Sequence, residues 1–306
     1  MRLRDFELTL PPEQRWENLT LANDFMFSKV MRDPELCTEM IRRIFPDMDI
    51  GHIEFTQPQK SVKHSFDTRG VRFDVFSKFD SRKLFDTEVQ TTSQTYMTRR
   101  TRAYHIAMGI EALETETLKT SGTYDDMPDT FVIFICTFDP FGLGLHKYTF
   151  SNICHEVDGL KLNDGAVTIF LNTCGTSNDI SGELKAFLDF MLGRKSDDPF
   201  VMRLDEQVKL AKLNAKWRRL YMKHLLHENA IRREGIAIGK EEGIAIGKEE
   251  GIAIGKEEGI ALGEERGRSN MLNTMLDLMR KQGLGYEQIN NIRDTALNIF
   301  AGELRS

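Results

Sequence analysis

Two segments of alternating polar and apolar residues, 71–79 and 84–91, constrain the fold of this chain more than any other feature. A short polar stretch around Ser81 and Arg82 separates them, and two alternating segments joined in this way are typical of a β-hairpin. Successive residues of a strand point to opposite faces. One face of such a hairpin is buried, and this requirement fixes which residues of the two strands share a side.

The apolar residues predict the register of this hairpin. Four of them are expected to share the buried face: Phe73, Val75, Phe85 and Val89. If the connecting loop has three residues, Asp80 to Arg82, then Asp74 lies directly opposite Glu88. Directly opposed Cβ atoms are about 4.5–5.5 Å apart. The hairpin therefore predicts two neighbouring carboxylates, with Asp86 and Gln90 on the same face as Glu88.

Two carboxylates at this separation repel each other unless a cation lies between them. A hard divalent ion such as Mg²⁺ suits oxygen ligands of this kind. A bound metal can activate water and neutralise charge on a scissile phosphate, which is what phosphodiester hydrolysis needs. Gln90 would then orient the attacking water or contact a phosphate oxygen. The same short pattern also fits a solvated hairpin face without a metal.

The rest of the first 200 residues alternates between helical and strand patterns. A helical segment is expected at 20–45, broken at Pro34 and capped by Asn23 or Asp24. The apolar run at 130–138 is typical of a strand covered on both faces. Further elements are expected at these positions: helices at 94–118, 181–192 and 198–233, and strands at 147–151 and 166–172. This order predicts an α/β domain.

Composition limits the classes of partner. The chain has 306 residues and a formal net charge of −6, so a contact with nucleic acid would have to come from local basic patches. No run of 18 apolar residues suggests a membrane span, and the N-terminus lacks a signal-peptide core, so a cytoplasmic location is expected. The four cysteines form no CxxC pair and are expected to be reduced, without a metal role.

Two basic clusters could meet DNA phosphates. Arg99, Arg100 and Arg102 lie with Tyr96 and Tyr104 on the predicted helix that follows Gln90. The second cluster interleaves aromatic residues with basic ones: Lys209, Lys212, Lys216, Trp217, Arg218, Arg219, Tyr221 and Lys223. Each cluster also fits a solvated helix face, with the aromatic side chains of the second one packed on the core.

The combined motifs resemble the PD-(D/E)XK nucleases, and more narrowly the bacterial recombination-promoting nuclease/putative transposase family. The matching stretches are NDFMFSKV (23–30), RFDVFSKFD (72–80), TEVQTT (87–92), TRRTRAYHIAMG (98–109), Tyr124 to Pro128 and FVIFICTFDPFG (131–142). The resemblance implies a restriction-endonuclease-like core with a mixed central sheet flanked by helices. It also implies DNA cleavage that depends on Mg²⁺ or another divalent cation, and a role in recombination or mobile-element transfer.

The resemblance assigns roles to individual residues. Asp74 and Glu88 carry over as metal ligands, and Gln90 occupies the position that lysine holds in the name-giving motif. Phe73 stands where that motif has proline. Asp24 is either a supporting acidic residue or an N-cap carboxylate. Three residues of the helix after Gln90 are assigned a supporting role: Arg99, Arg100 and Tyr104.

A tandem repeat follows this part of the chain. GIAIGKEE occurs three times in 235–258, and GIALGEER follows at 259–266. Glycine at every fourth position lets a second helix approach closely, and the glycine stripe winds in a right-handed sense because four exceeds 3.6. A helical stalk that makes the protein a homo-oligomer is favoured, with a flexible linker as the alternative.

The expected organisation has four parts. These are a nuclease-like domain (15–195), a basic helical connector (196–234), the repeat (235–267) and a C-terminal helical hairpin (268–306). Three functions fit this organisation: an active endonuclease, a catalytically silent DNA-binding or regulatory protein, and an oligomeric scaffold built on the repeat. The intact set of Asp74, Glu88 and Gln90 favours the first function.

Overall fold

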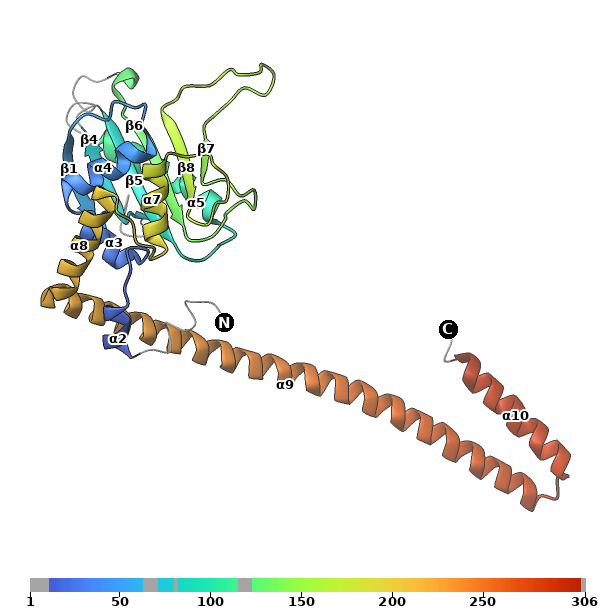
Figure 1. The fold of residues 1–306 in the computed structure, drawn as a ribbon. Helices are drawn as coiled ribbons and strands as arrows, with labels where there is room; N and C mark the ends of the chain where they lie inside the picture. Colours follow the sequence, from blue (N-terminus) through green and yellow to red (C-terminus); the bar gives the residue numbers. More distant parts are fainter. Residues whose placement is uncertain (1–10, 63–70, 80–81, 115–122, 304–306) are drawn as a thin grey trace. The chain divides into compact units, whose positions relative to one another are not determined.

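A six-stranded sheet forms the centre of the fold in the computed structural model, which describes residues 11–62, 71–79, 82–114 and 123–303 (Figure 1). Its strand order is β1-β4-β5-β6-β8-β7. The strands are β1 (Ile53–Pro58), β4 (Val75–Phe79), β5 (Lys83–Gln90), β6 (Asp129–Cys136), β7 (Lys147–Phe150) and β8 (Ala166–Asn172). Strands β5, β6 and β8 are parallel and the other neighbouring pairs are antiparallel, so the predicted mixed sheet is confirmed.

The β4–β5 hairpin has the predicted register. Val75 pairs with Thr87 and Phe79 pairs with Lys83, which leaves residues 80–82 as the connection. One step further along this register, Asp74 stands opposite Glu88. Asp80 and Ser81 lie outside the described residues, and Arg82 has a φ of 57°, in the left-handed region that closes many three-residue hairpin loops.

Both faces of the hairpin are buried, and this corrects one expectation. Val75, Phe85 and Val89 lie in one hydrophobic cluster, as predicted, but Phe73 lies in the other, stacked on Phe76 with 5.2 Å between ring centroids. A separate two-stranded ladder pairs β2 (Ser61–Val62) with β3 (Val71–Arg72). The strand is interrupted between β3 and β4, at residues 73 and 74, so the simple alternation does not run through this point.

Helices cover the two faces of the sheet unequally (Figure 1). Helix α5 (Met97–Leu113) packs on the face that carries Phe76 and Phe134. The other face is covered by α3 (Asp24–Val30), α4 (Pro34–Ile44), α7 (Gly182–Met191) and α8 (Pro199–Leu213). Strand β6 is buried on both sides, which explains its continuous apolar sequence and confirms the expectation for 130–138.

Most of the remaining elements lie where the sequence predicts them. Strands β7 and β8 match the expectations for 147–151 and 166–172, and α7 matches the one for 181–192. Helix α5 occupies the middle of the predicted helix 94–118, and residues 115–118 lie outside the described residues. A short 3-10 helix, η1 (Tyr124–Asp126), precedes β6.

Short polar side chains set several helix boundaries. The Asn23 side chain caps α3, and Asp33 caps α4 just before Pro34, so the predicted break at Pro34 is present. The expected single helix 198–233 is wrong, because Asn214 ends α8. Its side chain accepts hydrogen bonds from the backbone N–H groups of Lys216 and Trp217 and so caps the next helix, α9 (Ala215–Lys281).

The aromatic residues of the second basic cluster pack on the core. Tyr221 is 7% exposed, and its ring centroid lies 5.5 Å from those of both Trp16 and Phe25. Trp217 is partly buried against the same hydrophobic cluster. These side chains anchor the start of α9, so the alternative in which the aromatics belong to the core holds for them.

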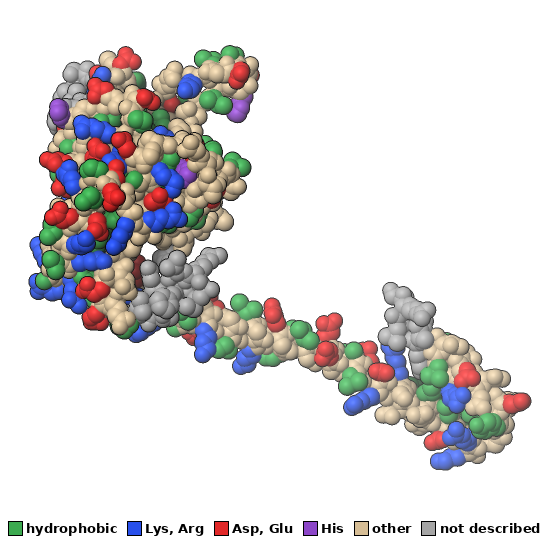
Figure 2. Space-filling model, viewed as in Figure 1, with side chains coloured by type: hydrophobic (Ala, Val, Ile, Leu, Met, Phe, Trp, Pro, Cys, Tyr) green, Lys and Arg blue, Asp and Glu red, His purple; other side chains and the backbone are tan. Residues whose placement is uncertain are grey.

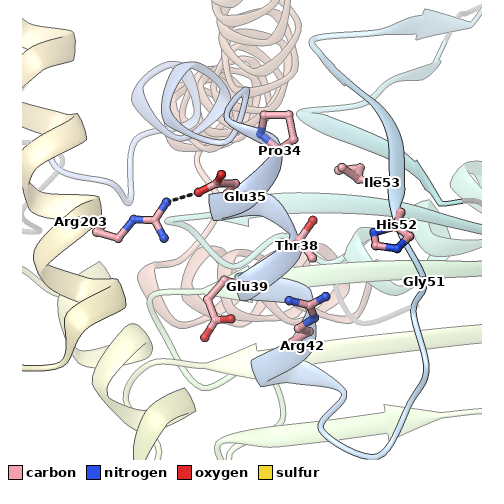
Figure 3. A pocket seen from close by; sticks show the side chains of 9 residues that line it. All are labelled: Pro34, Glu35, Thr38, Glu39, Arg42, Gly51, His52, Ile53 and Arg203. Carbon is pink, nitrogen blue, oxygen red and sulfur yellow. Dashed lines mark hydrogen bonds and ion pairs between the residues drawn. The ribbon is translucent and has the colours of Figure 1, made fainter.

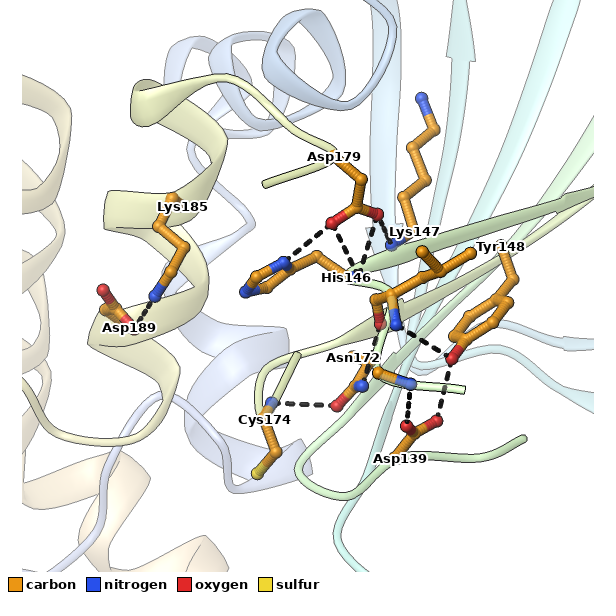
Figure 4. A network of polar contacts seen from close by, with 11 residues as sticks. Asp139, His146, Lys147, Tyr148, Asn172, Cys174, Asp179, Lys185 and Asp189 are labelled. Atoms are coloured by element: carbon orange, nitrogen blue, oxygen red, sulfur yellow. Dashed lines mark hydrogen bonds and ion pairs between the residues drawn. The ribbon is translucent and has the colours of Figure 1, made fainter. Parts of the chain in front are cut away.

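Two hydrogen-bonded carboxylates fix the loops at the carboxyl ends of β6 and β8 (Figure 4). Asp179 accepts bonds from the backbone of His146 and Lys147 and lies 2.9 Å from His146 Nδ1. Asp139 accepts bonds from three backbone N–H groups, including that of Gly144, and from the Tyr148 hydroxyl. These loops lie at the same end of the sheet as the carboxyl end of β5, because β5, β6 and β8 are parallel.

Residues 11–225 form a first unit, and residues 226–303 form a second one with most of α9 and the helix α10 (Tyr286–Glu303). The whole repeat, 235–267, is helical, and hydrophobic and charged side chains alternate along its surface in Figure 2. Each isoleucine of the repeat is more than half exposed. None of the described helices is long and apolar enough to cross a membrane.

Truncation of Phe85 tests the sheet core. This side chain is fully buried and stacks on Phe131 with 4.7 Å between ring centroids, with Phe79 5.2 Å away. We expect Phe85→Ala to lower the free energy of unfolding of the first unit by about 3–5 kcal/mol, because a large cavity opens between sheet and helices. Urea unfolding followed by circular dichroism measures the change. Tyr124→Ala, at an 87% exposed aromatic residue, is the control and should change stability by less than about 0.5 kcal/mol.

Candidate active site

Three carboxylates gather on the sheet face that α5 covers. Asp86 and Glu88 are two residues apart on β5 and so share this face, and Asp74 meets them from the residue just before β4. The exposed fractions of Asp86, Glu88 and Asp74 are 0%, 2% and 8% respectively. A solvated hairpin face is therefore excluded, because all three acids are buried.

Glu88 is held by three donors around its two carboxylate oxygens. Oε1 accepts a hydrogen bond of 2.9 Å from the backbone N–H of Asp74. Oε2 accepts one of 3.1 Å from Arg100 Nη2 and one of 3.0 Å from the Tyr104 hydroxyl. Burial raises the pKa of Glu88, although these donors act in the opposite direction.

Helix α5 supplies the two side chains that meet Glu88. Arg100 and Tyr104 are four residues apart, so they lie on the same side of the helix. Arg100 also donates to Gln90 Oε1 at 3.3 Å and hydrogen-bonds to the Tyr104 hydroxyl. Burial, followed by the charge of Glu88, raises the pKa of Tyr104, so its hydroxyl stays protonated and remains a donor.

Asp74 combines a strongly raised pKa with a hydrogen bond to the backbone. Its Oδ2 accepts from the Val89 N–H at 3.3 Å. Burial, the charge of Glu88 and the charge of Asp24 together raise the pKa of Asp74 to about 8. The carboxyl group of Asp74 therefore keeps its proton to a higher pH than an exposed aspartate does.

Asp86 lies on the face that the sequence predicts for it, but sequence reasoning did not assign it to the site. Neither of its carboxylate oxygens accepts a hydrogen bond from a donor in the described part of the chain. Burial and the charges of Glu88 and Asp74 raise its pKa well above the usual range. The signal was available in the sequence, because Asp86 alternates with Glu88 on an otherwise apolar strand.

The other predicted residues differ in whether they reach the acidic cluster. Asp24 is the first residue of α3, and the N-cap is Asn23, so the interpretation of Asp24 as an N-cap is wrong. Its carboxylate instead accepts a bond from the backbone N–H of Phe25, and its charge reaches Asp74. Arg99 is exposed to solvent on α5, one residue before Arg100.

The residues fit a divalent metal ion that has few protein ligands. Among residues 11–62, 71–79, 82–114 and 123–303, no group of three or more His, Cys, Asp or Glu side chains is arranged to hold an ion by itself. Mg²⁺ is usually bound through one or two carboxylates, together with water and substrate phosphates. The described donors reach Glu88 and Asp74 but none reaches the oxygens of Asp86, so one acid of the cluster lacks a hydrogen-bonded partner among the described residues.

The pocket in Figure 3 is separate from this site. It has a volume of about 400 Å³ and is lined by residues of α4, by residues 51–53 and by Arg203 of α8. Glu35 and Arg203 form an ion pair of 2.8 Å at its wall. None of the three buried acids lines it, and α4 and α8 cover the sheet face opposite the acids.

Comparison with family models gives the relationship of the chain. Residues 21–223, about two thirds of its length, match the model described as PD-(D/E)XK nuclease family transposase. The chain belongs to this family. The match confirms the resemblance seen in the sequence, and it includes all elements that build the acidic site. No curated protein and no solved structure matches the chain significantly.

The raised pKa of Asp74 predicts a pH-dependent stability. A carboxyl group whose pKa rises from its ordinary value of 3.8 to about 8 binds a proton in the folded state that the unfolded state releases. The free energy of unfolding of the metal-free protein should therefore fall as the pH rises from about 4 to about 8.

Thermal unfolding of the metal-free protein between about pH 5 and about pH 8 measures this dependence. Asp74→Asn should flatten the decrease, because the amide retains an acceptor for the Val89 N–H but cannot ionise. Glu13→Gln, at an exposed acid on α2 (Pro12–Glu17), is the control and should leave the decrease unchanged. An equally steep decrease in Asp74→Asn would contradict the assignment.

Proposed function

We propose that this family member is a metal-dependent DNA endonuclease that hydrolyses phosphodiester bonds and promotes recombination or mobile-element transfer. The observation that carries the proposal is the meeting of Asp74 and Glu88 at the end of a fixed hairpin register, inside a buried acidic cluster. Carboxylates are costly to bury without a counter-charge. A purely structural role does not explain why β5 and the residue just before β4 bring three of them together.

Asp74 and Glu88 are the proposed ligands of Mg²⁺ or another divalent cation. When bound, the ion supplies an activated water and neutralises charge on the scissile phosphate. Gln90 stands two residues beyond Glu88 along β5, and its amide can orient the water or contact a phosphate oxygen. The Tyr104 hydroxyl positions Glu88 through its 3.0 Å hydrogen bond.

Basic residues of α5 are proposed to contact the DNA backbone. Arg99 and Arg102 are exposed on the helix that also carries Arg100. Acidic and basic side chains are intermixed over the described residues of the face in Figure 2. Contacts with phosphate would then be local, as the negative net charge of the chain also requires.

A catalytically silent DNA-binding protein with the same fold is the second candidate. Gln90 favours it, since a lysine at this position is part of the name-giving motif. The buried Asp86, whose oxygens have no hydrogen-bond donor among the described residues, argues against it, because loss of a metal site removes the reason to keep acids in a sheet core. Activity assays separate the two.

Replacement of either proposed ligand should abolish Mg²⁺-dependent cleavage. Asp74→Ala and Glu88→Ala each remove a ligand while relieving repulsion among the acids, so both variants should remain folded. Nicking of supercoiled plasmid with and without Mg²⁺ measures the activity, and circular dichroism checks the fold. Asp158→Ala, at an exposed acid between β7 and β8, is the matched control and should cleave like the wild type. Full cleavage by Asp74→Ala would refute the assignment.

We further propose that the repeat in α9 associates with the repeat of a second copy. In a helix, side chains three and four positions apart are neighbours. Lys240 has Ile236, Ala237, Gly243 and Ile244 at these positions, and the lysines of the next two copies have the same neighbours. The charges of the three GIAIGKEE copies therefore have no opposite charge to pair with at helical spacing. They remain available to a neighbouring helix.

The exposed isoleucines and the glycines of the repeat also support its association with a second copy. Ile236 and Ile244 are 63% and 62% exposed on α9. Each glycine within the helix costs about 1 kcal/mol relative to alanine, so a lone helix of this sequence is marginal. A glycine stripe with a period of four favours a right-handed crossing of two helices, because their backbones can approach closely there.

Deletion of residues 235–266 tests this association. The first unit ends before the repeat, so the deletion variant should keep its core folded and its site competent. We expect it to lose self-association, and to nick plasmid more readily than it linearises it, because two sites are no longer held together. Light scattering and a cleavage time course on both proteins measure this. Unchanged mass and unchanged double-strand cutting would rule out the pairing.

A further inference from the structure

Arg100 connects a proposed metal ligand to the residue in the lysine position of the motif. Its guanidinium donates to Glu88 Oε2 at 3.1 Å through Nη2 and to Gln90 Oε1 at 3.3 Å through Nη1. The Arg100 side chain is 30% exposed, whereas the Glu88 side chain is 2% exposed. Arg100 therefore closes the acidic cluster from the solvent side.

The two carboxylate oxygens of Glu88 accept different numbers of hydrogen bonds. Oε2 already accepts two bonds, from Arg100 and Tyr104, which fills both of its lone pairs. Oε1 accepts one, from the Asp74 N–H. Oε1 thus keeps one lone pair for a metal ion, whereas an ion that also binds Oε2 requires one of the two donors there to leave. Arg100 is the donor that must do so, because a guanidinium and a divalent cation on one oxygen repel each other.

Gln90 gives the displaced guanidinium a second point of attachment. The amide oxygen is neutral, so Arg100 can stay bonded to it while a cation occupies Glu88. Aromatic faces also flank the guanidinium, with the Tyr104 and Phe134 ring centroids 5.3 and 5.8 Å from Arg100 Cζ. A cationic side chain at position 90 would instead repel Arg100.

We propose that Arg100 and the metal ion alternate at Glu88. Without metal, Arg100 acts as the counter-cation of Glu88. When a divalent cation binds, Arg100 yields Glu88 Oε2, remains attached to Gln90, and provides the positive charge for the scissile phosphate that lysine provides in the name-giving motif. Arg100 thereby weakens metal binding and strengthens catalysis. This inference rests on the proposed function.

Metal binding in the absence of DNA tests the first half of the proposal. Calorimetric titration of wild type and Arg100→Gln with Mn²⁺ should give a dissociation constant at least about tenfold lower for the variant, because a positive charge that competes for Glu88 is removed. Arg102→Gln removes the same charge from an exposed position of the same helix and should change the constant by less than about twofold. If Arg100→Gln unfolds, Arg100→Lys serves instead. Lysine keeps the positive charge but lacks the planar fork with which Arg100 spans Glu88 and Gln90, so a smaller shift in the same direction is expected.

Substitutions at positions 90 and 100 test the second half of the proposal, the role of Arg100 at the phosphate. Arg100→Gln should slow Mg²⁺-dependent plasmid nicking at least about 100-fold, as expected for the loss of one group that stabilises transition-state charge. Gln90→Lys alone should also slow it, because lysine and arginine then share one site. The double variant Gln90→Lys/Arg100→Gln restores a single cation. It should cleave at least about tenfold faster than Arg100→Gln.

The outcomes separate this proposal from the proposed function. Weaker or unchanged Mn²⁺ binding by Arg100→Gln, with normal binding by the wild type, overturns the alternation at Glu88 and leaves the nuclease assignment intact. A double variant no faster than Arg100→Gln overturns the role of Arg100 at the phosphate. Absence of Mn²⁺ binding and of cleavage in the wild type overturns both.

Discussion

The burial of three carboxylates, two on β5 and one just before β4, is the constraint on which the rest of this structure depends. Each ion removed from water costs several kcal/mol unless it is paired and hydrogen-bonded. The fold offsets this cost with backbone N–H groups of the hairpin and with two side chains from α5, Arg100 and Tyr104. It leaves Asp86 without any such donor among the described residues. The acids can stay there only because large apolar residues on both sides of the sheet fix the strands.

Strand β5 makes this arrangement stiff. It has β4 on one side and β6 on the other, so its backbone is hydrogen-bonded along both edges. Phe85 and Val89 anchor it to the helices on one face, while Asp86 and Glu88 lie on the face that α5 covers. A shift of this strand by one residue would exchange the two sets and place the acids in the larger apolar core. The apolar residues thus protect the geometry of the polar ones.

Much of this could be predicted from residue patterns, and the failures have physical causes. Alternation and loop length sufficed to pair Asp74 with Glu88, because strand periodicity is strict. Phe73 was placed on the wrong face because the ladder breaks beside it. The partners of Arg100 could not be predicted, since they depend on how α5 is rotated against the sheet. The same rotation leaves Arg99, its neighbour in the chain, exposed to solvent.

Because α9 runs unbroken through the repeat, each octapeptide adds a fixed length and a fixed rotation to the helix. Eight residues advance α9 by roughly 12 Å and turn it by about 80° beyond two full turns. Three copies are identical, and such tandem copies can be gained or lost as whole units without shifting the reading frame. Each gain or loss would therefore rotate the residues of α9 that follow the repeat, relative to those that precede it, as well as lengthen or shorten the helix. The number of octapeptides therefore sets both the length of α9 and the rotation between its two ends.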